Sequence, residues 1–264
     1  MLIIRRTLGS TAGKVLALPA MLVTIVLAAA VAFTVDDQVR GGGPCGSAIY
    51  DKSATVFGAI TICGTSDVAQ DKVAHAAAVA AQWLDNDQDG VADEPRLIEE
   101  LKSTDPIVMM TPSGISVWPG IRTIFARRGI QSTQDLGAQE TNPDGDRRDA
   151  SQEEIHHLIV NAGWQRLFPQ TFSETQSDQS TLFTAWQTAE SEGLYSYDDP
   201  TCDNSCKVTE FVYLATAAYL GSDADLENEE LRIPNQTRLR EQAPTVVEIF
   251  ESSDWDGVRP GRHA

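Results

Sequence analysis

Apolar residues recur with the period of an α-helix along most of the chain beyond residue 66. This pattern predicts helices at Asp67–Leu84, Pro95–Leu101, Ser151–Phe168, Ser180–Glu192, Cys206–Leu220 and Val246–Phe250, and a polar helix over Ala224–Glu241 that Pro234 interrupts. Asp67 is the expected N-cap of the first helix, because Gln70 completes a capping-box pattern. Pro169 and Gly221 mark the ends of two others.

Signals for β-strands are few. Apolar residues alternate in Ala54–Cys63, which predicts one strand, and Ile107–Met110 is a second short candidate. Residues 111–148 are rich in turn formers and are expected to be irregular, apart from a helix near Ile121–Arg128. The expected fold is therefore mainly α with at most a small sheet, in one helical globular domain over residues 54–251.

The first 32 residues predict export from the cytoplasm. Arg5, Arg6 and Lys14 precede an apolar run over 15–35, and Ala30-Val31-Ala32 is typical of a signal-peptidase site. The run is also long enough to span a bilayer, so cleavage and retention as a membrane anchor both stay open. Residues 33–53, with three glycines before a proline, are expected to be a linker, and residues 252–264 a disordered tail.

The chain is strongly acidic. Its formal net charge is −18, and it becomes about −21 without residues 1–32, which hold three basic side chains and no acid. Nucleic-acid binding needs basic patches that replace the counterions of phosphates, so the balance argues against that function. It is typical of a secreted or halotolerant protein, or of one that neutralises some carboxylates with metal cations.

The four cysteines are an even number, which suits disulfides in an exported protein. They are Cys45, Cys63, Cys202 and Cys206, and three pairings are open to them. Proximity along the chain favours Cys45–Cys63 and Cys202–Cys206. A zinc site built from all four is the alternative, although their spacing is not that of the common zinc motifs.

An acidic loop after the first predicted helix has the pattern of a calcium site. Its candidate ligands are four aspartates and one backbone carbonyl, at Asp85, Asp87, Asp89, Asp93 and Val91. Gly90 allows the sharp turn that such a loop needs. The twelfth position is Arg96 instead of a bidentate glutamate, so the loop resembles the shorter DxDxDGxxD loops of extracellular proteins. Glu94 is a further candidate ligand.

Residues 153–157 read Glu-Glu-Ile-His-His within a predicted helix. His157 shares a helix face with Glu153 at i,i+4 and with Glu154 at i,i+3, so an imidazole and a carboxylate can reach one metal ion. These ligands suit catalytic Zn²⁺, and a second glutamate there can act as general base. A capping box from Ser151 would instead occupy Glu154, unless Asp149 is the N-cap.

Two other polar side chains interrupt apolar helices. His75 lies in an alanine-rich stretch, and Glu210 lies where a lone carboxylate is costly unless it is paired or metal-bound. We therefore predict a zinc site whose ligands and catalytic carboxylate are His75, His157, Glu210, and Glu153 or Glu154. A ferritin-type di-iron site would need ExxH on two helices, and one helix has it.

Four motifs lie within residues 55–220: Lys72-Val73-Ala74-His75, Leu84-Asp85-Asn86-Asp87-x-Asp89-Gly90, Glu153-Glu154-x-x-His157-Leu158-Ile159, and Thr201-Cys202-Asp203-x-x-Cys206 with Thr209-Glu210. In combination they resemble a group of uncharacterised secreted proteins from bacteria and marine microbes. That resemblance implies export and metal binding and names no reaction. The helix with the third motif is also loosely similar to the zinc-binding helix of metallopeptidases, although it is neither HExxH nor HxxEH.

The sequence thus favours an exported, calcium-stabilised hydrolase in which Zn²⁺ activates water and a peptide is the substrate. The alternative is a calcium-binding extracellular protein without catalysis, whose Glu and His groups form a buried hydrogen-bond network. A third interpretation is a cell-surface binding module held by the N-terminal segment. The sequence defines neither the exact substrate nor the oligomeric state.

Overall fold

The computed structural model describes residues 33–36, 45, 49–114, 132–145, 147–227 and 230–254. The predicted export segment, the helix near Ile121–Arg128 and most of the predicted tail lie outside these residues. Within the described part of the chain, no helix is both long enough and apolar enough to cross a membrane.

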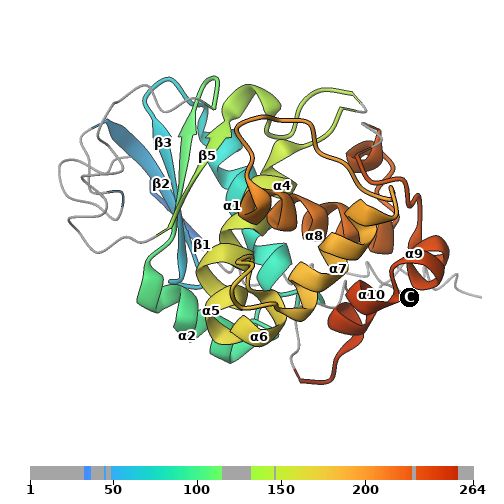
Figure 1. Ribbon diagram of the computed structural model, residues 1–264. Helices are drawn as coiled ribbons and strands as arrows, with labels where there is room; N and C mark the ends of the chain where they lie inside the picture. Colours follow the sequence, from blue (N-terminus) through green and yellow to red (C-terminus); the bar gives the residue numbers. More distant parts are fainter. Residues whose placement is uncertain are drawn as a thin grey trace, which may run out of the picture.

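A five-stranded sheet forms one side of the molecule (Figure 1). Its strands lie in chain order: β1 (Phe33–Asp36), β2 (Tyr50–Val56), β3 (Ile60–Thr65), β4 (Ile107–Thr111) and β5 (Thr133–Gly137). The first three are antiparallel, whereas β4 and β5 run parallel to β3. The single strand predicted over Ala54–Cys63 is wrong, because Phe57 and Gly58 both have positive φ and form the turn of the β2–β3 hairpin.

Two other segments differ from expectation at the sheet. Residues 33–53, predicted as a linker, contribute β1 and the start of β2. Residues 133–137, predicted as irregular, form β5 at the edge of the sheet. β1 is only four residues long and β5 lacks an alternation of apolar and polar residues, so both depend on pairing with a neighbouring strand.

The helices lie against one face of the sheet (Figure 1). Their bounds are α1 (Gln70–Leu84), α2 (Pro95–Thr104), α4 (Ala150–Ile159), α5 (Gln165–Leu167), α6 (Pro169–Phe172), α7 (Thr181–Ser191), α8 (Asn204–Leu220), α9 (Gln236–Gln242) and α10 (Pro244–Glu251). Short 3₁₀ turns form η1 (Ala138–Glu140) and η3 (Ala224–Leu226), and Val160–Trp164 is a π-helix, η2. The expected mainly helical fold with a small sheet is confirmed.

The helices form two layers. α1 packs on β2 and β3, and α4 packs beside it on β5. α8 lies against α4 on the side away from the sheet, in contact with α7, α9 and α10 (Figure 1). Ala76, Ala77 and Ala80 of α1 are fully buried, and their small side chains let the sheet and α4 approach closely. The α4–α8 contact is the one that positions the candidate site.

Three helix predictions need correction. α1 begins after Ala69, which makes no side-chain cap, so Asp67 is not the N-cap. The helix predicted over Ser151–Phe168 consists of α4, the π-helix η2 and α5 in succession. The polar helix predicted over Ala224–Glu241 is wrong: η3 is followed by a break through Pro234, and α9 starts only after Asn235 caps it.

The two faces of the sheet carry separate apolar clusters. Val108 and Met110 of β4 face the helices and belong to the main core. The opposite face has a smaller buried cluster of Cys45, Tyr50, Cys63, Ile107 and Met109. The Cys45–Cys63 disulfide lies there, with Cα atoms 5.7 Å apart, which confirms the predicted pairing.

Candidate metal centre

The start of α4 is fixed by bonds around Asp149. Its Oδ1 accepts hydrogen bonds from Ser151 N at 3.1 Å and Ser151 Oγ at 2.7 Å, so Asp149 is the N-cap. Its Oδ2 lies 2.6 Å from His75 Nε2, on α1. Because Asp149 caps the helix instead of Ser151, neither Glu153 nor Glu154 is used in a capping box.

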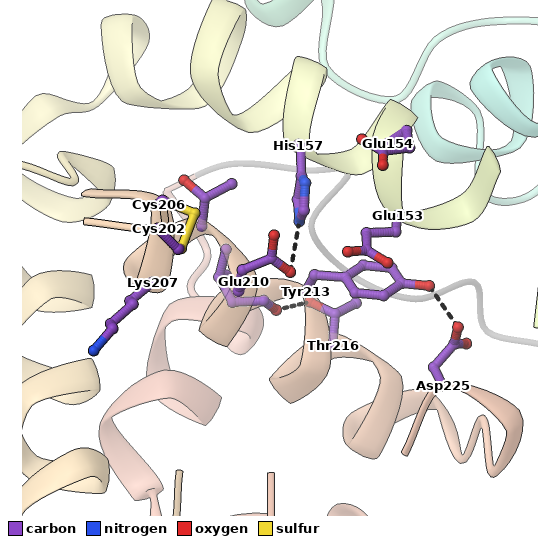
Figure 2. A network of polar contacts seen from close by, with 12 residues as sticks. Glu153, Glu154, His157, Cys202, Cys206, Lys207, Glu210, Tyr213, Thr216 and Asp225 are labelled. Carbon is purple, nitrogen blue, oxygen red and sulfur yellow. Dashed lines mark hydrogen bonds and ion pairs between the residues drawn. A yellow bond between two sulfur atoms is a disulfide. The ribbon is translucent and has the colours of Figure 1, made fainter. Parts of the chain in front are cut away.

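Glu153 and His157 meet Glu210 of α8 across the α4–α8 contact (Figure 2). We call these three residues the Glu–His cluster. One ligand atom from each lies within 4.8 Å of the others, and His157 Nε2 is 3.6 Å from Glu210 Oε2. The i,i+4 spacing places Glu153 and His157 on one face of α4, as predicted. The cluster can therefore hold a metal ion.

His157 Nε2 is a buried atom that lacks a hydrogen bond. The residue is 5% exposed, and no hydrogen-bond partner for Nε2 exists among the described residues. Burial lowers the pKa of His157 well below its usual value, and the nearby His156 and Arg148 lower it further. The ring is therefore neutral at physiological pH and has a nitrogen lone pair for a ligand.

Burial raises the pKa of Glu210 to about 7, although Arg148 acts in the opposite direction. α8 is almost wholly apolar around Glu210, so the folded chain desolvates this carboxylate. The desolvation of a carboxylate at Glu210, which the sequence predicted to be costly, is thus present in the folded chain. A divalent cation would offset it, because it would favour the charged form of Glu210.

Arg148 is a basic side chain next to the Glu–His cluster. Its guanidinium pairs with Glu153, and its Nε lies 3.3 Å from Asp225 Oδ1. The guanidinium carbon lies 5.8 Å from the centre of the Tyr213 ring, and Tyr213 Oη donates to Asp225 Oδ1 at 2.8 Å (Figure 2). Arg148 therefore neutralises part of the negative charge of Glu153 and Asp225, which a metal ion bound to the cluster would otherwise compensate.

Two predicted site residues lie outside the Glu–His cluster. His75 pairs with Asp149, so it holds the start of α4 to α1 instead of joining the three-residue group. Glu154 accepts a hydrogen bond from Gln134 Nε2 of β5. Burial raises the pKa of Glu154 to about 7, and the charge of Glu210 contributes to this increase. Of the two glutamates, Glu153 is thus the one that meets His157.

The acidic loop between α1 and α2 forms a tight turn. Asp85 Oδ2 accepts from Gly90 N at 2.8 Å, and Asp89 Oδ1 accepts from Val91 N at 2.8 Å. Gly90 has φ +89°, which confirms its predicted role in the turn. One carboxylate oxygen from each of Asp85, Asp87 and Asp89 lies within 4.8 Å of the others. These three side chains can hold a metal ion.

The remaining candidates in the loop have other contacts. Asp93 Oδ2 accepts from Asn86 N at 2.7 Å and from Asn86 Nδ2 at 2.8 Å, and Asp93 is not in the three-carboxylate group. Glu94 caps α2 by accepting from Arg96 N and also pairs with the Arg96 guanidinium at 2.6 Å. Glu94 therefore serves the start of α2 and is not a free ligand for the loop.

The second disulfide lies at the start of α8. Cys202 and Cys206 are bonded, with Cα atoms 5.2 Å apart, as their proximity predicted. Asp203, between them, caps the helix by accepting from Cys206 N at 3.1 Å. All four cysteines are thus used in disulfides, which rules out the four-cysteine zinc site. Two disulfides indicate an oxidising environment outside the cytoplasm.

The sequence did not identify several residues that shape the site. Arg148 follows a turn-rich stretch, and its local sequence gives no sign of its pairing with Glu153. Asp225 and Gln134 lie far from α4 in the chain, and nothing in their local sequence separates them from surface residues. No protein-family model, no curated protein and no solved structure matches the chain.

Proposed function

We propose that this protein is an exported metal-dependent hydrolase whose metal ion is held by Glu153, His157 and Glu210. The observation that carries the proposal is the buried, neutral His157, whose Nε2 has no hydrogen-bond partner among the described residues and faces two carboxylates. Leaving such an atom unsatisfied costs about 1–3 kcal/mol. A metal ion bound to Nε2 would remove that cost.

The ligand types are ones that zinc accepts. One imidazole nitrogen and two carboxylate oxygens form a three-ligand set of the kind that leaves a fourth position open in catalytic zinc sites. A bound Zn²⁺ would act as a Lewis acid and bring the pKa of a coordinated water near 7. Glu153, His157 and Glu210 would position the ion, and the apolar residues around α8 would limit access of bulk water.

We assign proton transfer to Glu154. With Glu153 used as a ligand, Glu154 is the remaining carboxyl group of the pair, and its pKa of about 7 suits a general base at neutral pH. The proposed substrate is a peptide, since the third sequence motif is loosely similar to a metallopeptidase helix. Export is supported by the two disulfides and the predicted N-terminal segment.

The contacts of Arg148 favour the second candidate function, a calcium-binding extracellular protein without catalysis. A guanidinium that already pairs with Glu153 and Asp225 can serve as a permanent counter-ion of a buried polar network. In that case His157 and Glu210 would stabilise the α4–α8 contact without any transition metal. The two candidates therefore differ in the metal content of the purified protein.

Metal analysis of the exported domain tests the first candidate. We expect about one Zn²⁺ per chain in the wild type after dialysis, and none in His157→Ala, because a three-ligand site loses its only nitrogen. His156→Ala is the matched control: His156 is buried to a similar extent, but its ring packs 4.8 Å from Trp83. A wild type without transition metal, or a His157→Ala variant that retains it, would contradict the proposal.

We also propose that the loop with Asp85, Asp87 and Asp89 binds Ca²⁺, with the Val91 carbonyl as a further ligand and Asp93 reaching the ion through a water molecule. Calcium prefers such clusters of hard oxygen ligands. At a Ca²⁺ concentration about ten times Kd, binding adds about 1.4 kcal/mol to the free energy of unfolding, or roughly 3–5 °C in Tm.

Asp87→Asn should abolish most of this calcium-dependent increase in Tm, because it removes one of the three converging carboxylates. Asp144→Asn is the control, since Asp144 is also exposed and also lies in a turn before a glycine. Differential scanning calorimetry with and without Ca²⁺ makes the comparison. Equal increases in both variants would show that the loop is an ordinary polar turn.

A further inference from the structure

A polar network beside the Glu–His cluster joins η2, α5, α8 and the loop after α6. Thr209 of α8 has its Oγ1 3.0 Å from Glu174 Oε2 and 3.3 Å from Asn161 Oδ1. Gln165 Nε2 donates to the same two oxygens, at 2.9 Å to Glu174 and 3.0 Å to Asn161. The network therefore joins four segments through two shared acceptors, the carboxylate of Glu174 and the amide oxygen of Asn161.

Each side of the network is close in sequence to a proposed ligand. Asn161 follows His157 by four residues and lies in the π-helix, a rare element that is often found next to functional sites. Thr209 immediately precedes Glu210, and its side chain is buried at 4% exposure. Any shift of α8 along α4 would break these bonds and would also change the 3.6 Å separation of His157 and Glu210.

In the described part of the chain, few other polar contacts join α4 and α8 near the site. The disulfide and the Asp203 cap fix the start of α8 but do not attach it to α4. Most of the remaining α8 side chains that face inward are apolar, and apolar contacts tolerate small sliding motions better than hydrogen bonds do. Bonds to the Glu174 carboxylate are charge-assisted, so they are stronger than bonds between neutral groups.

We infer that Thr209 and Glu174 are positioning residues, which hold Glu210 at the distance from His157 that a shared metal ion requires. The inference rests on the proposed metal site and adds to it the contacts that set its geometry. Residues that orient metal ligands in this way commonly change metal affinity by 10–100-fold when they are mutated. They touch neither the ion nor the substrate.

The test is the Zn²⁺ affinity of the full exported domain, measured by competition with a chromophoric chelator. Thr209→Val keeps the shape of the side chain and removes its hydroxyl, so we expect Zn²⁺ binding about tenfold weaker than in the wild type. Thr209→Ser restores the hydroxyl and should restore the affinity. Glu174→Ala, at a half-buried loop position, should weaken binding similarly and provides a second variant if Thr209→Val folds poorly.

Thr216→Val is the matched control on the same helix. Thr216 is buried like Thr209, but its hydroxyl donates to Val212 O of its own helix at 2.8 Å. Both valine variants should lose a similar amount of Tm, and only Thr209→Val should lose Zn²⁺ affinity. Equal affinity in Thr209→Val and Thr216→Val would overturn the inference alone. A wild type that binds no Zn²⁺ would overturn the proposed function together with it.

Discussion

Arg148→Gln is expected to tighten Zn²⁺ binding by about a hundredfold. The guanidinium of Arg148 pairs with Glu153 and lies 3.3 Å from Asp225, so a metal ion must compete with it for Glu153. A divalent ion and a unit positive charge about 5 Å apart repel each other by several kcal/mol at an effective dielectric constant near 20. The Arg148 side chain is 31% exposed, so solvent screens part of that repulsion.

The same substitution should destabilise the metal-free protein, because Glu153 and Asp225 lose their counter-ion. Tighter Zn²⁺ binding together with lower stability of the metal-free protein would show that Arg148 competes with the metal ion for Glu153. General damage to the fold would instead lower both. Isothermal titration with Zn²⁺ and thermal unfolding of the metal-free protein measure the two effects. Arg166→Gln is the control, since Arg166 pairs with Glu100 at 2.7 Å away from the Glu–His cluster.

An Arg148→Gln variant that binds Zn²⁺ no better than the wild type would favour the second candidate function. Arg148 would then be a permanent part of a buried ionic network, and the Glu–His cluster would not bind a metal ion. Weaker binding in the variant would mean that Arg148 supports the site instead of competing for it. Each result therefore changes the interpretation of the cluster.

Interactions within a few residues were the ones that the sequence predicted well. The i,i+4 spacing of Glu153 and His157 depends only on helix geometry, and α4 forms where the apolar pattern placed it. The turn at Gly90 and the Cys202–Cys206 pairing, four residues apart, are equally local. In each case the atoms that interact are fixed by short stretches of chain.

Long-range packing decided the rest of the site. His75 was predicted to bind zinc, but its partner is Asp149, 74 residues away. The sequence around His75 does not distinguish an aspartate partner from a metal ion. Glu153 and Glu154 are equivalent by spacing from His157, and only the position of α8 selects Glu153. Similarly, β5 is defined by its pairing with β4 and not by its own sequence.

Glu154→Gln is expected to stabilise the protein at pH 8 by about 3 kcal/mol. Burial raises the pKa of Glu154 from 4.5 to about 7 in the folded chain. Between these values the folded state binds more protons than the unfolded state, so the free energy of unfolding falls as the pH rises. Each pKa unit corresponds to about 1.36 kcal/mol, and the loss is complete only above pH 7. Glutamine carries no charge at any pH.

The variant should therefore gain stability over the wild type progressively from about pH 4.5 to pH 8, and little below that range. Glutamine still offers an oxygen to Gln134 Nε2, so the hydrogen bond is retained. Chemical denaturation of the metal-free protein at several pH values measures the difference, which includes the lost repulsion between Glu154 and Glu210. Glu99→Gln is the control, because Glu99 is 74% exposed and pairs with Lys102 at 2.9 Å.

A stabilising Glu154→Gln substitution would also bear on function. A buried carboxylate that weakens the fold at neutral pH has no structural advantage over glutamine, whereas a general base must be able to lose its proton. The same variant is thus expected to retain Zn²⁺ and to lose most peptide hydrolysis. A variant that is more stable and equally active would remove Glu154 from the reaction. A variant less stable than the wild type at pH 8 would instead show that the charged carboxylate supports the fold.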